Sequence, residues 1–163
     1  MIQVHLEDDT YQIREPPLRN SGHKGGIFLS RCKLESHDGT KTLQAQDIYL
    51  GGKVTILAHE FEVHDCDQYT FKYMEANANL WQYSDLGLVN LKVKAKKEAL
   101  KRILVTYPNL ASRQVDVDGL CELLQKAGTT FVKQEVCTLF RAVDTQRTGV
   151  VKMTKMLKYI MDL

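Results

Sequence analysis

Residues 54–75, VTILAHEFEVHDCDQYTFKYME, constrain the fold more than any other stretch. Residues 54–56 and 61–63 alternate apolar and polar side chains, as two strands of a hairpin do, and the chain turns between them. Asp67 is a favourable N-cap residue, and the apolar side chains that follow it at 69–74 are spaced for a helix. A hairpin that leads directly into a helix predicts the closing element of a small α+β domain.

The residues ahead of this hairpin supply further strands. Residues 3–15 predict a hairpin around the turn formers Glu7-Asp8-Asp9-Thr10, and Pro16-Pro17 ends it because proline cannot donate to a ladder. Residues 27–34 predict another strand, and residues 43–49 a brief helical or irregular segment. We expect all of these strands to join one antiparallel sheet.

Three separated runs in this half resemble a known family: LEDDTYQIREPPLRNSG (6–22), IFLSRCKL (27–34) and HEFEVHDCDQYTFKYME (59–75). They are similar to the DM-ten domain of axonemal, EF-hand-containing proteins of the myoclonin type. The resemblance implies a small, PH-like antiparallel sheet module with a capping helix. The family domain usually has strand sequence ahead of the EDDT turn, so we expect either a sheet that lacks its N-terminal strand or numbering from within a longer protein.

The second half of the chain is helical and differs in charge. Residues 1–80 hold 8 Lys/Arg against 12 Asp/Glu, whereas residues 81–163 hold 14 against 8, which favours two modules with different surfaces. We expect a connector at 81–91 and a helix at 92–107 stopped by Pro108. Its exposed side carries basic residues, which make a candidate partner surface: Lys92, Lys94, Lys96, Lys97, Lys101 and Arg102. Two interpretations remain open, namely attraction to an acidic partner such as tubulin or nucleic acid, and a solvated lysine-rich face.

Residues 115–127 and 151–163 repeat one pattern, a short β-like run followed by an amphipathic helix, at a spacing of 36 residues. With an amphipathic helix at 131–143 between them, this spacing resembles that of tandem EF-hands. The predicted organisation is therefore a DM-ten-like domain at 1–80, a connector at 81–91 and a degenerate EF-hand pair at 92–163.

The loops of this pair lack the ligands that calcium requires. The second loop offers Asp144 at position 1, Gln146 at 3, Thr148 at 5, Gly149 at the turn position 6 and Lys155 at 12, where the EF-hand pattern needs a bidentate glutamate. The first loop, which begins at Pro108, ends on Gly119. We expect a retained fold without bound calcium, and no other metal or cofactor. His59 and His64 are five residues apart on a strand, which places them on opposite faces and argues against a shared metal.

The sequence shows no phosphate loop or nucleophile elbow, so we expect no enzyme. It also shows no secretory signal and no apolar run of the ~20 residues that a membrane helix needs, which predicts a cytosolic chain with four reduced cysteines and no membrane partner. Of the two acidic partners considered for the basic residues, we expect tubulin and not nucleic acid. The resemblance implies a structural protein of the ciliary or flagellar axoneme that binds tubulin and neighbouring inner proteins inside doublet microtubules. The alternative is a signalling adaptor, whose sheet module binds a peptide or lipid headgroup while a groove at Met153, Met156 and Met161 holds a partner helix.

Overall fold

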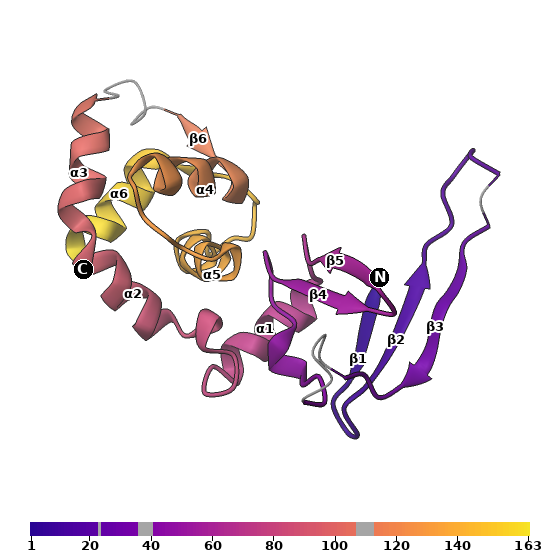
Figure 1. Cartoon of the computed structure of the whole chain (residues 1–163). Helices are drawn as coiled ribbons and strands as arrows, with labels where there is room; N and C mark the ends of the chain where they lie inside the picture. Colours follow the sequence, from indigo (N-terminus) through magenta and orange to yellow (C-terminus); the bar gives the residue numbers. More distant parts are fainter. Residues whose placement is uncertain (23, 36–40, 107–112) are drawn as a thin grey trace. The chain divides into compact units, whose positions relative to one another are not determined.

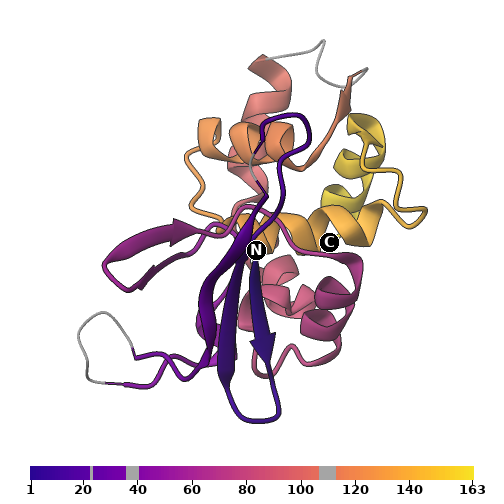
Figure 2. The same cartoon turned by 90° about the vertical axis from the view of Figure 1, so that its right-hand side faces the viewer.

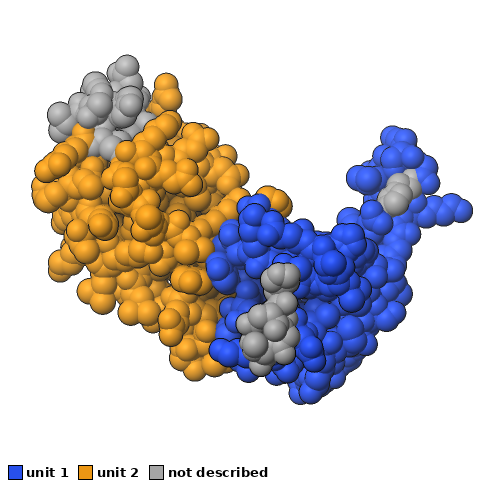
Figure 3. Space-filling model, in the orientation of Figure 1, with its two compact units in different colours: residues 1–63 blue, residues 64–163 orange. Residues whose placement is uncertain are grey.

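The computed structural model describes residues 1–22, 24–35, 41–106 and 113–163. These residues form two compact units, Met1–Val63 and His64–Leu163 (Figures 1 and 3). Unit 1 holds β1 (Ile2–His5), β2 (Thr10–Glu15), β3 (Gly26–Cys32), the 3-10 turn η1 (Ala45–Asp47), β4 (Lys53–Ile56) and β5 (His59–Glu62). Unit 2 holds α1 (Gln68–Ala76), η2 (Gln82–Ser84), α2 (Leu86–Ala95), α3 (Lys97–Thr106), β6 (Gln114–Val115), α4 (Val117–Lys126), α5 (Lys133–Val143), β7 (Val151–Lys152) and α6 (Met153–Asp162). Small antiparallel sheets followed by helices confirm the predicted α+β class. Within the described ranges, no helix is both long enough and apolar enough to cross a membrane.

The first sheet of unit 1 has the antiparallel order β1-β2-β3, and β2 pairs with β3 through an irregular register. The predicted acidic turn joins β1 to β2. Arg31 on β3 holds this turn, because its Nη2 lies 2.7 Å from a carboxylate oxygen of Glu7 and 2.7 Å from one of Asp8, and its Nε donates to the hydroxyl of Thr10. The acidic turn residues are therefore matched by a basic residue on the third strand.

The prediction of a single sheet was wrong. Strands β4 and β5 pair only with each other among the described strands, as a separate two-stranded hairpin (Figures 1 and 2). Both sheets instead contribute side chains to one core, in which Tyr11 is fully buried and donates its hydroxyl to the carbonyl of Leu43 at 3.0 Å. The core members are Tyr11, Ile13, Leu34, Leu43, Ile48, Val54 and Ile56. The hairpin thus joins the unit by packing its apolar side chains into the core. The alternation of apolar and polar residues predicts strands with one buried face, but it does not show which other strands they hydrogen-bond to.

Helix α1 begins where the sequence predicts, since the carboxylate of Asp67 accepts the N–H of Thr70 at 2.8 Å. The prediction assigned this helix and the following residues, up to position 80, to the sheet domain. In the structure the boundary between the units falls at Val63, and α1 belongs to the helical unit. The physical reason is a set of polar contacts between α1 and α5.

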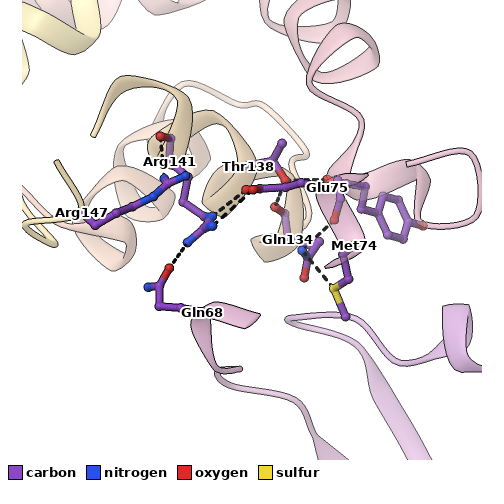
Figure 4. A network of polar contacts seen from close by, with 9 residues as sticks. Gln68, Met74, Glu75, Gln134, Thr138, Arg141 and Arg147 are labelled. Carbon is purple, nitrogen blue, oxygen red and sulfur yellow. Dashed lines mark hydrogen bonds and ion pairs between the residues drawn. The ribbon is translucent and has the colours of Figure 1, made fainter. Parts of the chain in front are cut away.

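Arg141 on α5 makes most of these contacts (Figure 4). Its side chain is 7% exposed, and its guanidinium donates to both carboxylate oxygens of Glu75, at 2.6 and 3.2 Å, and to Oε1 of Gln68 at 2.6 Å. The same guanidinium lies 4.4 Å from the centre of the Phe71 ring. A buried cation needs such partners, because leaving it unpaired in a dry environment is costly.

Gln134 lies about two turns before Arg141 on α5 and extends the same contact surface. Its amide Nε2 donates to the hydroxyl of Ser84 at 2.9 Å and lies 3.6 Å from the sulfur of Met74. Trp81 is buried nearby in sequence, edge-to-face with Tyr73 at 5.6 Å between ring centres. The connector residues therefore pack within the helical unit.

The single helix predicted at 92–107 is two helices. Asp85 caps α2 by accepting the N–H groups of Gly87 and Leu88, so this helix begins six residues earlier than predicted. It ends at Ala95, and Lys96 leaves the helical geometry with φ −105° and ψ 7° before α3 starts. The apolar spacing of residues 92–107 predicts a buried side made of Val93, Leu100, Ile103 and Leu104. Val93 and Leu100 are buried, whereas the side chains of Ile103 and Leu104 and the predicted stop at Pro108 lie outside what the structure describes.

The last four helices have the arrangement predicted for a pair of EF-hands. Helices α3 and α4 flank one loop, α5 and α6 flank the other, and β6 pairs antiparallel with β7 between the two loops, with Val115 opposite Val151. A continuous core fills the space between them, with Leu124, Leu139 and Met156 among its most buried side chains.

The Arg141 contacts generate a stability prediction. Glu75→Ala leaves the buried guanidinium without its carboxylate, so we expect a loss of about 3 kcal/mol, the lower end for breaking a buried pair because Glu75 is partly exposed. Urea unfolding followed by the fluorescence of the single tryptophan, Trp81, measures it.

The matched control is Glu122→Ala. Glu122 faces Lys126 at 3.9 Å with both side chains more than 60% exposed, so this change should alter stability by less than about 0.5 kcal/mol. Equal effects of the two substitutions would show that Arg141 does not hold α1.

Candidate functional site

The sequence offered two candidate sites, the vestigial loop at residues 144–155 and the basic residues at 92–102. Both lie in the helical unit. The loop follows α5 directly, and its first residue, Asp144, is the C-cap of that helix. The loop is also tied to the Arg141 contacts, since Nη1 of Arg147 donates to the backbone carbonyl of Arg141 at 2.7 Å.

Asp144 organises the loop through hydrogen bonds. Its carboxylate accepts the N–H of Thr148 at 3.1 Å and the N–H of Gly149 at 2.8 Å, and the Thr148 hydroxyl lies 3.0 Å away. Burial of Asp144 is the largest single influence on its pKa and raises it, but these hydrogen bonds together outweigh burial and lower the pKa. Gly149 occupies the predicted turn position with φ +78°, a conformation that favours glycine.

Lys155 occupies the twelfth position with a fixed interaction of its own. Its Nζ donates to the carbonyl of Val143 at 2.7 Å, which closes the loop from its last position back to the end of α5. The surface hollow beside the loop, about 540 Å³ in volume, is lined by two further lysines, Lys152 and Lys158. A divalent cation would therefore meet an ammonium group where the EF-hand pattern supplies a carboxylate. In the other loop, residues 108–112 lie outside the described chain. At its twelfth position Gly119 has no side chain, and its backbone N–H donates to the carboxylate of Asp116.

The six basic residues differ in the contacts that they make. Three of them make contacts within the chain: Lys92 pairs with Glu135 at 2.7 Å, Lys97 donates to the Met161 carbonyl near the end of α6 at 2.5 Å, and Lys101 pairs with Glu98 at 2.6 Å. Lys94, Lys96 and Arg102 are exposed. The described residues provide no ion-pair partner for Lys94 or Lys96, so the candidate surface narrows to the C-terminal end of α2.

Burial also changes the acidity of cysteine thiols in the structure. Burial raises the pKa of the Cys137 thiol, and that of the Cys66 thiol, to about 12. Burial likewise raises the pKa of Cys121. These thiols are protonated at neutral pH, and a thiol is a weak nucleophile and a weak metal ligand compared with its thiolate.

Sequence reasoning missed one feature of this region, the exposed leucines of α2, because residues 81–91 were interpreted as a connector. A signal was present. Asp85 precedes a run of apolar residues that continues to Val93, which is the pattern of a capped helix start.

A first prediction for the loop concerns calcium. We expect calorimetric titration to show no calcium site tighter than ~1 mM, because position 12 holds an ammonium in one loop and no side chain in the other. The matched gain-of-binding variant is Gln146→Asp with Thr148→Asp and Lys155→Glu, which supplies carboxylates at positions 1, 3, 5 and 12 and should bind calcium measurably. Heat of binding from the unaltered chain below ~1 mM would contradict the assignment.

A second prediction concerns pH. The pKa of Asp144 is lowered on folding, so its carboxylate stabilises the fold above its unfolded value of 3.8, and this contribution disappears as the pH falls through the lower folded pKa. Asp144→Asn should therefore cost about 1–2 kcal/mol at pH 7 and progressively less below pH ~4. Thermal unfolding of both chains between pH 7 and 3 measures the difference. A difference that does not shrink at low pH would show that the charge is unimportant.

Comparison with known proteins supports both halves of this description. The DM10 domain family matches residues 1–70. The chain is 30% identical to EF-hand domain-containing family member C2 of Bos taurus, over 86% of this chain and 21% of that protein. It is 27% identical to the member of the same name from Danio rerio, over 99% of this chain and 23% of that protein. It is 35% identical to EF-hand domain-containing protein 1 of Mus musculus, over 70% of this chain and 17% of that protein.

The chain therefore spans about a fifth of the length of the curated relatives it matches. The resemblance drawn from the sequence is confirmed: residues 1–70 match the DM10 domain family, and through both of its units the chain is similar to a segment of the EF-hand domain-containing proteins.

Proposed function

We propose that this chain is a non-catalytic structural protein of the ciliary axoneme that binds tubulin and neighbouring proteins in the lumen of doublet microtubules. The family resemblance motivates the setting, since the DM-ten domain with an EF-hand pair is typical of axonemal proteins. The observation that supports binding is a pair of exposed lysines at the end of α2, Lys94 and Lys96, for which the described part of the chain provides no ion-pair partner. Unpaired exposed lysines attract an acidic surface, and tubulin is strongly acidic.

The loops support a constitutive role over a calcium-regulated one. Lys155 closes the second loop with its own positive charge, so the helices α5 and α6 are held without an exchangeable ion. A structural protein needs one lasting conformation, and this contact supplies it locally.

The adaptor alternative receives less support. Its partner groove required accessible methionines, whereas Met153 and Met156 are buried in the core of unit 2 and Met161 packs against it. These side chains stabilise the fold and present no groove.

The test is co-sedimentation of the chain with microtubules across a salt series. Lys94→Glu with Lys96→Glu should weaken binding at least threefold at low salt, and the remaining binding should vary less with salt, since exposed charges act over a Debye length of ~8 Å at physiological salt. Both side chains are exposed, so the core of the helical unit is untouched.

The matched control is Lys72→Glu with Lys158→Glu. These lysines are also exposed, and the double substitution changes the net charge of +2 by the same amount. We expect this control to bind nearly as the parent does. Equal pelleting of all three chains at low salt would remove the end of α2 from the interface.

A further inference from the structure

Helix α2 is apolar on two opposite faces. Val89 and Val93 are buried in the core, as expected for a helix that packs against α5. Leu88, Leu91 and Ala95 occupy the other face, because positions i, i+3 and i+7 of a helix with 3.6 residues per turn lie on one stripe. Leu88 is 50% and Leu91 65% exposed. We call Leu88, Leu91 and Ala95 the α2 strip.

Basic residues border the α2 strip. Lys92 lies on one side and Lys94 on the other, and Lys96 follows at the end of the helix. Lys92 is engaged with Glu135, whereas the described residues leave Lys94 and Lys96 without an ion-pair partner. Along this helix only Asp85 is acidic, and it serves as the N-cap. The strip is thus a small apolar surface that is bordered by lysines.

We propose that the α2 strip docks an acidic amphipathic helix of another protein, one that carries leucine-like side chains on one face and glutamate or aspartate on its flanks. Apolar side chains at i, i+3 and i+7 match the side-chain spacing of a second helix packed alongside. The acidic flanks would face Lys94 and Lys96 and set the orientation of the partner. This inference requires an acidic helical partner and does not depend on tubulin.

Charge decides against two other occupants. A second copy of the chain would bring Lys92, Lys94 and Lys96 of one molecule against the same residues of the other, and like charges in contact oppose association. A lipid surface would be held by two leucines and one alanine only, because the opposite face of α2 is filled by the core. Interfacial helices need a larger apolar face than this.

The experiment uses a fluorescein-labelled peptide of about 15 residues, with leucines at helical spacing and glutamates between them, titrated with the full chain and followed by anisotropy. We expect saturable binding, at least tenfold weaker for Leu88→Ser with Leu91→Ser. We also expect weaker binding for Lys94→Glu with Lys96→Glu, and none for a peptide in which lysine replaces glutamate.

The matched control is Leu18→Ser with Leu57→Ser, which removes two leucines of unit 1 that are 62% and 63% exposed. This control should bind the acidic peptide as the parent does. The proposal is overturned if the strip variant binds like the parent, if the control loses as much affinity, or if the basic peptide binds equally well.

Two further measurements would reassign the strip and so overturn the proposal. If sedimentation equilibrium shows a dimer, and Leu88→Ser with Leu91→Ser dissolves it, the strip belongs to an interface with a second copy. Binding to phosphatidylserine vesicles that the same variant abolishes assigns it to lipid.

Discussion

The helical unit depends on one buried guanidinium. Arg141 sits on the most buried helix of the unit, and every partner of its side chain that the structure describes, Glu75, Gln68 and Phe71, lies on α1. The fork of an arginine fixes distance and direction at once, since Nε and Nη2 both reach the same carboxylate. These contacts tie α1 to α5 within the helical unit, which begins at His64.

Other charges in the unit are used in the same way. Glu135 accepts the backbone N–H of Val132 at 2.8 Å, which satisfies the start of α5, and the same oxygen accepts Lys92 from α2 at 2.7 Å. Lys97 places its ammonium on a carbonyl near the C-terminal end of α6, where the helix dipole favours a positive charge. The excess of lysine in this half is thus partly structural. A composition argument cannot separate lysines that hold helices together from lysines that face solvent.

Much of the fold follows from local patterns. The turn at Glu7–Thr10, the N-cap at Asp67 and the turn glycine at 149 are each determined by a few neighbouring residues, and each is found where it was predicted. The break at Lys96 was not predictable, because neither proline nor glycine marks it. It arises where α2 packs on α5 while Lys97 reaches α6, which are contacts between residues distant in sequence.

The candidate site was predictable to the same extent. The identity of Lys155 was sufficient to argue against calcium, whereas its hydrogen bond to Val143 required the structure. The division of the basic residues into engaged and unengaged sets likewise depends on Glu135 and Met161, which are 43 and 64 residues away from their lysines. The α2 strip was hidden because the helix boundary was placed too late.

An ammonium group attached to the chain at position 12 of the loop differs thermodynamically from a bound ion. A protein that binds an ion only when folded gains stability as RT ln(1 + [L]/Kd), so its stability and the order of its loop vary with the ion concentration. Lys155 is attached to α6 and is present at every ion concentration, and its bond to the Val143 carbonyl spans the same loop that an ion would close. The hydrogen bonds of Asp144 to Thr148 and Gly149 keep the turn formed from the other end. Both ends of this loop are therefore held by hydrogen bonds from groups that belong to the chain itself.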